Sequence, residues 1–446
     1  MENKVVKRKL VDRFLDVIER AGNKLPDPVT LFVILAFFVL ALSFALSKLG
    51  VSAVKPGTDE TIEVINLLNR EGLIQIVTNM VTNFTGFAPL GIVVVTMIGI
   101  GVAENSGLIS ALMKKTVLSA PKKLILPVII FTGLVGTVAA DAAFIILPPI
   151  AAMIFMSVGR NPLVGLIATY AAIAGGFSAN IIISSLDVLL LGITQTAAQL
   201  VDPTYTGLAT MNYYFMIVST FLIVIVASWV TVKFVEPRFG KYSGEVEVAE
   251  PLTALENKGL RWAGIVTLAY IILIAILVVP ESGLLRNPED NGFLNSPFMT
   301  GIVPIMLFFF LLPGLAYGIV TKKVKSDRDV AEQMFKSIAD LSSFIVLAFV
   351  AAQMIAYFGW SNIGPILAIK GAEFLQNMNF TGAPMFIGFI IICALINLLI
   401  ASASAKWALL APIFVPMFMY LNYSPAVTQM AYRVGDSITN PITPLL

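Results

Sequence analysis

The sequence predicts an all-α polytopic membrane protein with broken transmembrane helices. Three observations predict this class. First, 58% of the 446 residues are apolar and 13% are charged, whereas soluble domains average about 45–50% and about 25%. Second, long apolar runs recur along the chain, as expected of membrane-spanning helices. Third, many of the 32 Gly and 24 Pro residues interrupt these runs, which lipid tolerates only where protein or water satisfies the freed backbone groups.

The composition excludes several other classes of protein. The chain has no His, so imidazole catalysis and His-ligated metals are excluded. Its one cysteine, Cys393, cannot form an internal disulfide or a Cys-based metal site. The net charge of +2 does not suggest nucleic-acid binding, and the phosphate-binding loop motif of ATPases is missing. We therefore expect no cofactor, and the lack of His and of paired carboxylates at helical spacing disfavours an intramembrane enzyme.

Residues 1–28 are expected to form a cytoplasmic amphipathic segment that lies on the membrane surface. One face of this segment carries apolar side chains: Val11, Phe14, Leu15 and Ile18. Such a stripe suits an interfacial helix. The following apolar run, 29–47, is too long for the apolar core of a signal peptide and predicts a retained helix. Residues 29–446 then form the transmembrane domain.

The loops sort by charge. Basic residues gather at 114–123, 233–261 and 322–336, whereas 48–83 and 281–297 are poor in Lys and Arg. Because cytoplasmic loops carry an excess of Lys and Arg, the basic segments are expected to be cytoplasmic loops, and 48–83 and 281–297 external loops. This alternation predicts a cytoplasmic N-terminus. The clear spans are expected at about 29–47, 88–112, 124–140, 212–232, 263–280, 299–320, 338–358 and 383–400.

Two apolar regions, 139–198 and 401–446, are broken by Pro, Gly, Ser and Asn and resemble each other. Leu147-Pro148 matches Ala411-Pro412, Asn161-Pro162 matches Ser424-Pro425, and Gly176-x-Ser178 matches Gly435-x-Ser437. Three matches in order at a nearly constant offset indicate an internal duplication. Duplicated halves with broken helices at matching places are typical of secondary transporters with a binding site near the membrane midplane.

Five charged residues fall inside these two broken regions: Asp141, Asp187, Lys406, Arg433 and Asp436. A charge that faced lipid would cost several kcal/mol, so each is expected to face a cavity or a partner. They either serve a binding site or pair with one another to hold the bundle together. Their confinement to the two broken regions favours the binding site for the set as a whole.

The second region suggests the chemistry of the ligand. Arg433 offers a planar fork that suits a carboxylate, and a broken helix exposes N–H groups that attract anions. Trp407 offers a flat ring for an aromatic group, although a membrane-interface position is an equally good reading. Ser404 adds a hydroxyl. These features predict an anionic, partly aromatic small molecule.

The coupling ion is H⁺ or Na⁺. Asp187 is the candidate coupling residue, because a carboxylate in an apolar surround can take up a proton on one side of the membrane and release it on the other. Hydroxyl and amide oxygens beside exposed carbonyls suit a small cation equally well. A Na⁺ site is therefore the alternative, at Ser178, Asn180, Ser437 and Asn440.

Four motifs resemble those of the AbgT family, the p-aminobenzoyl-glutamate transporters, within the wider ion-transporter superfamily. The resemblance runs from residue 19 to the C-terminus, and the last motif is the most specific. The motifs are ERAGNKLPDP at 19–28, AGGFSAN at 174–180, SAKW at 404–407 with APIFVPM at 411–417, and GDSITNPITP at 435–444.

The resemblance implies a dimer in the bacterial inner membrane, with about nine spanning helices and with inverted repeats that contain two re-entrant helical hairpins. Members are described as importing p-aminobenzoyl-glutamate, a folate breakdown product, and some as exporting sulfonamide antimetabolites with the proton gradient. The substrate-binding residues it implies, together with the residues read above, are Asn180, Asn397, Ser404, Trp407, Pro425, Arg433, Asp436 and Pro444. The coupling residue is Asp187, and the supporting residues are Asp141, Ser178, Lys406, Ser437, Thr439 and Asn440.

One feature departs from the family. Members continue past the final Pro-rich motif into another apolar helix, whereas this chain stops at Leu446. Repeat 1 is therefore expected at about 88–232, and repeat 2 at about 299–446 without the final family helix.

Three functions are compatible with these residues. The leading one is ion-coupled secondary transport, by alternating access, of p-aminobenzoyl-glutamate or a related aromatic acyl-amino acid. The second is proton-driven export of sulfonamide antimetabolites through the same cavity. The third is a passive anion channel, which the duplicated and Pro-bounded segments disfavour, since they suit alternating access rather than a continuous pore.

Overall fold

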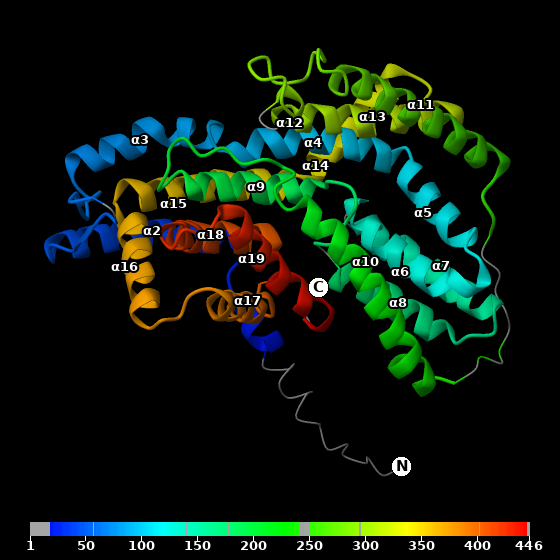
Figure 1. Cartoon of the computed structure of the whole chain (residues 1–446), viewed down its shortest axis with the longest axis horizontal. Coiled ribbons are helices and arrows are strands. Elements are labelled where there is room, and N and C mark those ends of the chain that lie inside the picture. Colours follow the sequence, from blue (N-terminus) through cyan, green and yellow to red (C-terminus); the bar gives the residue numbers. More distant parts are fainter. Residues whose placement is uncertain are drawn as a thin grey trace, which may run out of the picture. The chain divides into compact units, whose positions relative to one another are not determined.

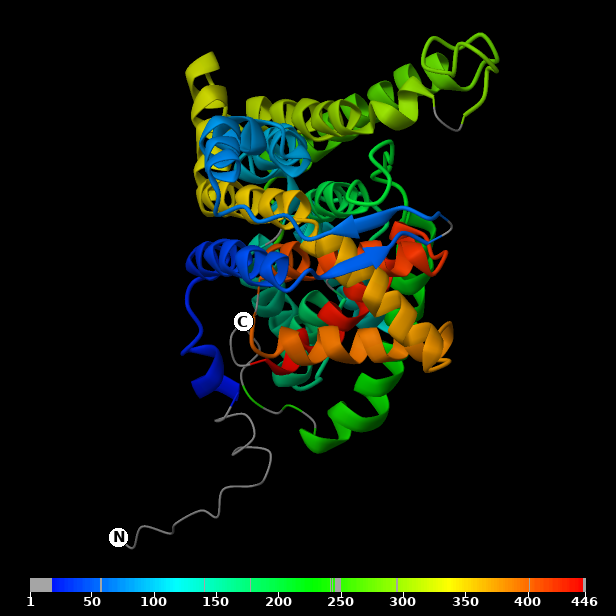
Figure 2. The same cartoon turned by 90° about the vertical axis from the view of Figure 1, so that its left-hand side faces the viewer.

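The computed structural model describes residues 18–443 except 57, 140, 177, 241, 243, 245–249, 294, 295 and 401, and leaves out the side chains of 139, 141 and 142. The described chain is predominantly α-helical. Its regular strands are β1 (Ser52–Val54) and β2 (Thr61–Glu63), which pair antiparallel (Figure 2). The predicted all-α class is confirmed.

The chain divides into two compact units. Unit 1 comprises Met1–Ala88, Gly192–Thr206 and Phe344–Leu446, and unit 2 comprises Pro89–Leu191 and Gly207–Ser343. Both units contain segments from distant parts of the sequence. The expected division into a segment 1–28 and a domain 29–446 with two repeats stays a prediction.

Unit 1 holds most of the helices near the two ends of the chain (Figure 1). They are α2 (Pro28–Lys48), α3 (Arg70–Thr85), α15 (Ser342–Trp360), α16 (Ile363–Asn377), α17 (Ala383–Asn397), α18 (Ala403–Tyr420) and α19 (Pro425–Thr439). Unit 1 also includes the end of α9 (Ser185–Ala198) and the 3-10 turn η5 (Asn440–Ile442).

Unit 2 holds the middle of the chain. Its helices are α4 (Ala88–Asn105), α5 (Leu108–Leu118), α6 (Ile125–Gly136), α7 (Asp141–Ser157), α8 (Pro162–Gly175), the start of α9, α10 (Tyr213–Val230), α11 (Ala254–Val278), α12 (Pro297–Thr300), α13 (Ile302–Val320) and α14 (Asp327–Asp340). Its short turns are η1 (Lys122–Leu124), η2 (Thr137–Ala139), η3 (Thr231–Val235) and η4 (Glu236–Arg238). The apolar core of this unit is centred on α6, α7 and α8.

Seven helical stretches among the described residues are long and apolar enough to cross a membrane. They are Pro28–Lys48, Arg70–Asn105, Tyr213–Arg238, Ala254–Val278, Ile302–Val320, Ser342–Trp360 and Ala403–Tyr420. A further bent pair, Leu108–Leu118 with Lys122–Gly136, turns by 113°. Large apolar side chains such as Phe37, Ile225 and Ile276 are 61–69% exposed. A helix that is apolar on its outer face as well suits a lipid surround, and the polytopic prediction is confirmed.

Two expected boundaries were wrong. Residues 48–83 were expected to be an external loop, but they include most of α3, which begins at the N-cap Asn69. Its polar and apolar residues alternate at helical spacing, so the segment has no long apolar run from which a helix could be predicted. The single span expected at 88–112 breaks at Gly107, whose φ of +85° is readily adopted by glycine. Of the expected surface segment 1–28, residues 1–17 lie outside the described residues, and 18–22 are helical.

The two hairpins, α7–α8 and α18–α19, turn in the same way. Asn161 caps α8 through a 3.0 Å hydrogen bond from the Leu163 N–H, and Ser424 caps α19 through a 3.4 Å bond from Val427 N–H. A proline occupies the first helical position after each cap, where its missing N–H costs nothing. The matched Asn-Pro and Ser-Pro pairs therefore have one structural role, which supports the predicted duplication.

Each hairpin also packs against the helix that precedes it at equivalent positions. A Cβ added to Gly176 would lie 1.7 Å from Leu134 Cδ2 on α6, and one added to Gly435 would lie 2.6 Å from Cys393 Cβ on α17. The two glycines and their two neighbours are all related by 259 residues. The second arm of each hairpin thus needs glycine because the preceding helix approaches so closely.

We expect Gly435→Ala to lower the free energy of unfolding by about 1–3 kcal/mol, the usual cost of overpacking. The added methyl would also meet the Ile390 carbonyl oxygen at 2.6 Å, so α17 and α19 must move apart. Unfolding of the purified protein by SDS titration measures this loss. The control is Gly91→Ala on α4, where an added Cβ meets nothing within 4 Å. An equal loss in both variants would contradict the packing argument.

Candidate functional site

The charged residues of the second region gather in unit 1 where α17 ends and α18 begins. Ser402 caps α18 and accepts a 3.3 Å hydrogen bond from the Ala405 N–H. The hydroxyl of Ser404 lies 3.2 Å from that of Ser402. The cap fixes the start of α18, so Lys406 and Trp407 lie one turn into the helix with their side chains buried.

Lys406 and Asp436 form a buried ion pair between α18 and α19. The Lys406 Nζ lies 2.5 Å from Asp436 Oδ1, and these residues are 0% and 2% exposed. Tyr432 places its hydroxyl 3.3 Å from the same carboxylate oxygen and donates to the Ala403 carbonyl at 2.5 Å. Removing one member of a buried pair typically costs 3–5 kcal/mol, because the other charge stays buried. The pair therefore fastens the two arms of the hairpin together.

Asn397 connects this pair to the end of α19. Its Oδ1 accepts a hydrogen bond from Lys406 Nζ. Its Nδ2 lies within 2.7–2.8 Å of the Asp436 carbonyl, Thr439 Oγ1 and Asn440 Oδ1. Thr439 in turn donates to the Ala394 carbonyl of α17 at 3.0 Å. The structure thus brings five predicted residues into one network: Asn397, Lys406, Asp436, Thr439 and Asn440.

Trp407 is covered in the described conformation. Its ring stacks on Tyr432 with centroids 4.5 Å apart, and the side chain is 0% exposed. Its Nε1 donates to Thr194 Oγ1 at 2.9 Å, and Gln429 Nε2 donates to the same oxygen at 2.8 Å. The membrane-interface reading does not describe this residue, because Trp407 lies inside unit 1. A substrate ring can reach Trp407 only if the hairpin opens.

Arg433 and Pro425 belong to the second arm, α19. Arg433 is buried, at 2% exposed, and its carbonyl accepts a 2.8 Å hydrogen bond from Ser437 Oγ. Pro425 is the first helical residue after the Ser424 cap, so a structural role in the turn accounts for its presence. Pro444 lies outside the described residues.

The first region places its polar residues in unit 2. Asn180 Nδ2 donates to Thr137 Oγ1 at 3.1 Å, which matches the Asn397–Asn440 contact of the other half at an offset of 260 residues. Asn180 Oδ1 accepts from two backbone N–H groups, those of Ile181 and Ile182. Equivalent hydrogen bonds therefore fasten both hairpins to the preceding helix.

Asp187 caps α9. Its Oδ2 accepts hydrogen bonds from the Ser184 backbone N–H at 2.6 Å and the Ser184 hydroxyl at 2.8 Å, and it is 2% exposed. A carboxylate in the first turn of a helix also interacts favourably with the helix dipole. This structural role exists beside the coupling role that the sequence predicts. The side chain of Asp141 lies outside the described residues.

The four residues considered for Na⁺ are divided between the two units. Ser178 and Asn180 belong to unit 2, and Ser437 and Asn440 to unit 1. Ser437 donates to its own helix, whereas Asn440 and Asn180 oxygens already accept hydrogen bonds. Ser178 Oγ is buried and has no hydrogen-bond partner within the described residues. Those residues also contain no cluster of three or more His, Cys, Asp or Glu side chains that could hold a metal ion.

Three residues of the network were missed from the sequence: Thr194, Gln429 and Tyr432. Thr194 and Gln429 are uncharged polar residues that are 0–1% exposed, and intramembrane polar groups are a signal of function. Considering charged residues alone left them out. Tyr432 was not predicted, because an aromatic residue among apolar neighbours is usually interpreted as part of the hydrophobic core.

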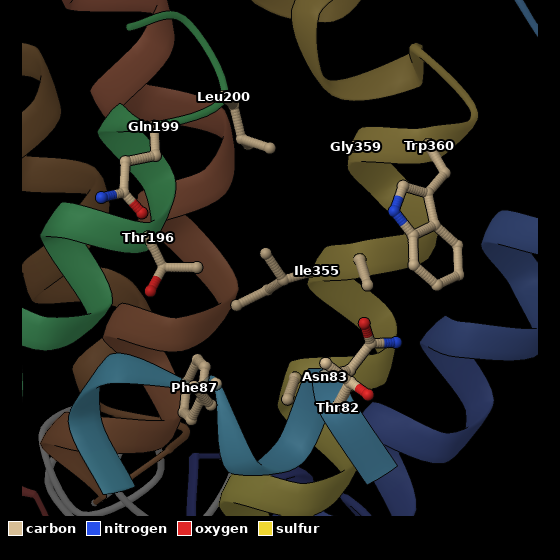
Figure 3. A pocket seen from close by; sticks show the side chains of 12 residues that line it. Thr82, Asn83, Phe87, Thr196, Gln199, Leu200, Ile355, Gly359 and Trp360 are labelled. Atoms are coloured by element: carbon tan, nitrogen blue, oxygen red, sulfur yellow. The ribbon is translucent and has the colours of Figure 1, made fainter. Parts of the chain in front are cut away.

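An open pocket of about 320 Å³ lies elsewhere in unit 1. Figure 3 shows Asn83, Gln199 and Trp360 around it, contributed by α3, the end of α9 and α15. The amide nitrogens donate elsewhere, Asn83 to Gln353 Oε1 and Gln199 to the Tyr205 carbonyl, so these amides offer acceptors to a ligand. The lining residues, all in the described part of the chain, carry no charge. This pocket alone therefore does not account for binding of a dicarboxylate.

Known proteins of similar sequence are transporters. The family described as "AbgT putative transporter family" matches residues 13–446. The p-aminobenzoyl-glutamate transport protein of Escherichia coli (strain K12) is 39% identical over 429 residues, which cover 96% of this chain and 84% of that relative.

Two solved structures share the fold over nearly the whole chain. The Alcanivorax borkumensis YdaH transporter, whose crystal structure is described as having an unusual topology, gives a TM-score of 0.90 at 39% identity over 94% of this chain and 89% of its own. Neisseria gonorrhoeae MtrF, described with a class of antimetabolite efflux pumps, gives 0.93 at 45% identity over 97% and 89%. The chain therefore belongs to the AbgT family of multi-pass membrane transporters.

Proposed function

We propose that this protein moves p-aminobenzoyl-glutamate, or a related aromatic acyl-amino acid, across a bacterial inner membrane by ion-coupled alternating access. The name of the Escherichia coli relative supports the substrate. The observation that carries the mechanism is the buried Lys406–Asp436 pair with Asn397, at the start of the second hairpin. Charges this deep are retained where they line a substrate or ion pathway.

In this proposal the substrate's carboxylates bind Arg433 and the N-terminal end of α18. Its aromatic ring reaches Trp407 after the hairpin opens. Lys406, Trp407, Arg433 and Asp436 are all 0–2% exposed, so the described conformation is closed around them. A transporter needs such a closed state between its two open states, and opening requires breaking the ion pair and the Trp407–Tyr432 stack.

The coupling ion we propose is the proton. The Lys406 ammonium already occupies the position between Asn397 Oδ1 and Asp436 Oδ1 where a bound cation would sit. Protonation of Asp436 would remove one charge of the pair and release the hairpin. Asp187 stays a candidate for the same role. The Asp187 substitutions described below distinguish the two carboxylates. A cytoplasmic N-terminus and a homodimer complete the proposal, supported by the loop charges and the family resemblance.

The test is the flux of labelled p-aminobenzoyl-glutamate into proteoliposomes under an imposed proton or sodium gradient. We expect a proton gradient to drive uptake and a sodium gradient to fail. Arg433→Ala should abolish coupled flux, whereas Arg328→Ala on the exposed face of α14 should not. Full activity of Arg433→Ala would refute the site, and uptake driven by sodium alone would refute the proton.

Asp187 is tested by two substitutions that separate its roles. Asp187→Asn keeps an oxygen that can cap α9 but cannot carry a proton, whereas Asp187→Ala removes both functions. Loss of coupled flux in both variants assigns Asp187 to coupling. Activity in Asp187→Asn but not in Asp187→Ala assigns it to the cap alone and leaves Asp436 as the coupling carboxylate.

Export of sulfonamide antimetabolites is the second candidate function. It is favoured by the 45% identity to MtrF, which is described with antimetabolite efflux pumps. A sulfonamide has an aminobenzene ring but lacks the two carboxylates, so its transport should tolerate Arg433→Ala. Accumulation of a sulfonamide inside inverted vesicles that persists in this variant would support export that does not need the carboxylate-binding residue. Gradient-independent flux at channel rates would contradict both transport functions.

A further inference from the structure

A groove between α5 and α11 of unit 2 has no part in the transport site. Its volume is about 560 Å³. The hydrogen bond from Lys115 Nζ to Asn257 Oδ1, at 2.9 Å, fixes one end of the groove. From there α5 runs back to Leu108 while α11 runs forward to Ile271, so the two walls are antiparallel. The floor is built on two small buried residues, Ala111 and Ala263.

The groove is polar and basic at one end and apolar along its length. Lys115 and Arg261 lie within about one turn of each other at the basic end, and Leu112, Leu268 and Ile271 are 48–60% exposed along the rest. The distance from Arg261 to Ile271 along the helix is about 15 Å, which is half of a hydrocarbon core about 30 Å thick. The groove therefore has the length and polarity of one lipid leaflet.

We propose that this groove binds one anionic phospholipid. Its headgroup pairs with Lys115 and Arg261, and an acyl chain lies along α11 past Gly264. Basic pockets between transmembrane helices suit anionic headgroups, and Glu256, the acidic residue of the first turn of α11, is engaged with Thr253 in a capping box. The occupant is identified by charge complementarity at one end and apolar complementarity along the rest.

Gly264 offers a direct way to close the groove. A Cβ built on Gly264 meets nothing within 4 Å, so Gly264→Leu places a side chain in the groove from a position where the backbone leaves room for it. Leucine also has a higher helix propensity than glycine, so the fold is retained. Gly91→Leu on α4 is the matched control, because an added Cβ there is equally unobstructed.

The readout is fluorescence quenching by phospholipids brominated on their acyl chains. A tryptophan is introduced by Leu268→Trp, two turns beyond Arg261 on the groove wall, in a chain carrying Trp229→Phe, Trp262→Phe and Trp360→Phe. A second chain keeps Trp262, which helical geometry places on the opposite side of α11 from Gly264, and carries Trp229→Phe and Trp360→Phe. Trp407 is 0% exposed and is retained in both. Each chain is then placed in phosphatidylcholine vesicles that contain a minor fraction of a brominated lipid, either phosphatidylglycerol or phosphatidylcholine.

We expect brominated phosphatidylglycerol to quench the groove reporter with an apparent affinity about thirtyfold above that of phosphatidylcholine, which corresponds to about 1 kcal/mol for each of the two basic residues. The Trp262 reporter should show little preference. Lys115→Gln with Arg261→Gln should remove the preference, whereas Lys122→Gln with Lys123→Gln should keep it. Gly264→Leu should reduce groove quenching by both lipids, and Gly91→Leu should not.

Three results would overturn the proposal. One is equal quenching by the two lipids at the groove reporter. Another is an equal loss of preference in the Lys122/Lys123 control. The third is a groove reporter that neither lipid quenches until the protein is dissociated to monomers, which would assign the groove to a second copy of the chain. None of these results depends on transport activity.

Discussion

We expect Lys406→Met to lower the free energy of unfolding by about 3–5 kcal/mol, because it leaves the Asp436 carboxylate buried without its counter-charge. Lys406 Nζ lies 2.5 Å from that carboxylate and also donates to Asn397, so two interactions of the second hairpin are lost together. SDS-titration unfolding measures the loss. Asp436→Leu should be similarly destabilised, since it strands the Lys406 ammonium.

The double variant Lys406→Met with Asp436→Leu separates structure from function. Replacing both members of a buried ion pair by apolar residues is often neutral or stabilising, so we expect stability to return close to that of the wild type. Coupled flux should stay absent, because no titratable pair remains in the hairpin. Lys370→Met with Glu373→Leu, an exposed pair on α16, is the control and should change neither quantity. Normal coupled flux in the Lys406/Asp436 double variant would refute the proposed switch.

The second large effect is expected for Trp407→Ala. Replacing a buried tryptophan with alanine lowers the free energy of unfolding by about 3–5 kcal/mol. Trp407 is 0% exposed, and its ring stacks on Tyr432. Trp407→Phe should cost about 1 kcal/mol, since it loses the N–H bond to Thr194 but keeps a ring against Tyr432. The control Trp229→Ala removes a side chain that is 59% exposed and should cost little.

Substrate preference distinguishes two roles of the Trp407 ring, packing within the protein and stacking on the substrate. If the ring stacks on the substrate in an open state, Trp407→Phe should retain most of the affinity for p-aminobenzoyl-glutamate, and Trp407→Ala should lose it. Competition by glutamate, which has the carboxylates but no ring, should be the same in both variants. Unchanged affinity for the aromatic substrate in a folded Trp407→Ala protein would leave Trp407 with a packing role alone.

Much of the fold was predictable because its causes are local. Apolar runs of 18 residues or more report spanning helices directly, and Asn161-Pro162 and Ser424-Pro425 fix the two hairpin turns through cap and proline chemistry. The helix α3 was missed because polar residues such as Gln75, Asn79 and Asn83 interrupt its apolar side chains, so it contains no long apolar run. The break at Gly107 was missed because one glycine is compatible with either a continuous or a broken helix.

The candidate site was predictable in its residues but not in its connections. Charged groups in an apolar segment stand out from sequence alone, which is how Lys406, Arg433 and Asp436 were found. Which charge pairs with which depends on how α17, α18 and α19 approach one another. That is a non-local property, and it is why the pairing of Lys406 with Asp436 was not predicted.

The sequence by itself determined the class of protein, the two broken regions and the charged residues they contain, since composition and pattern carry that information along the chain. Only the tertiary structure decided that Lys406, Asn397 and Asp436 form one buried network and that Trp407 is covered by Tyr432. The physical reason is that burial and pairing are set by contacts between segments up to 235 residues apart, as between Thr194 and Gln429. No local sequence pattern specifies contacts between residues so far apart in the chain.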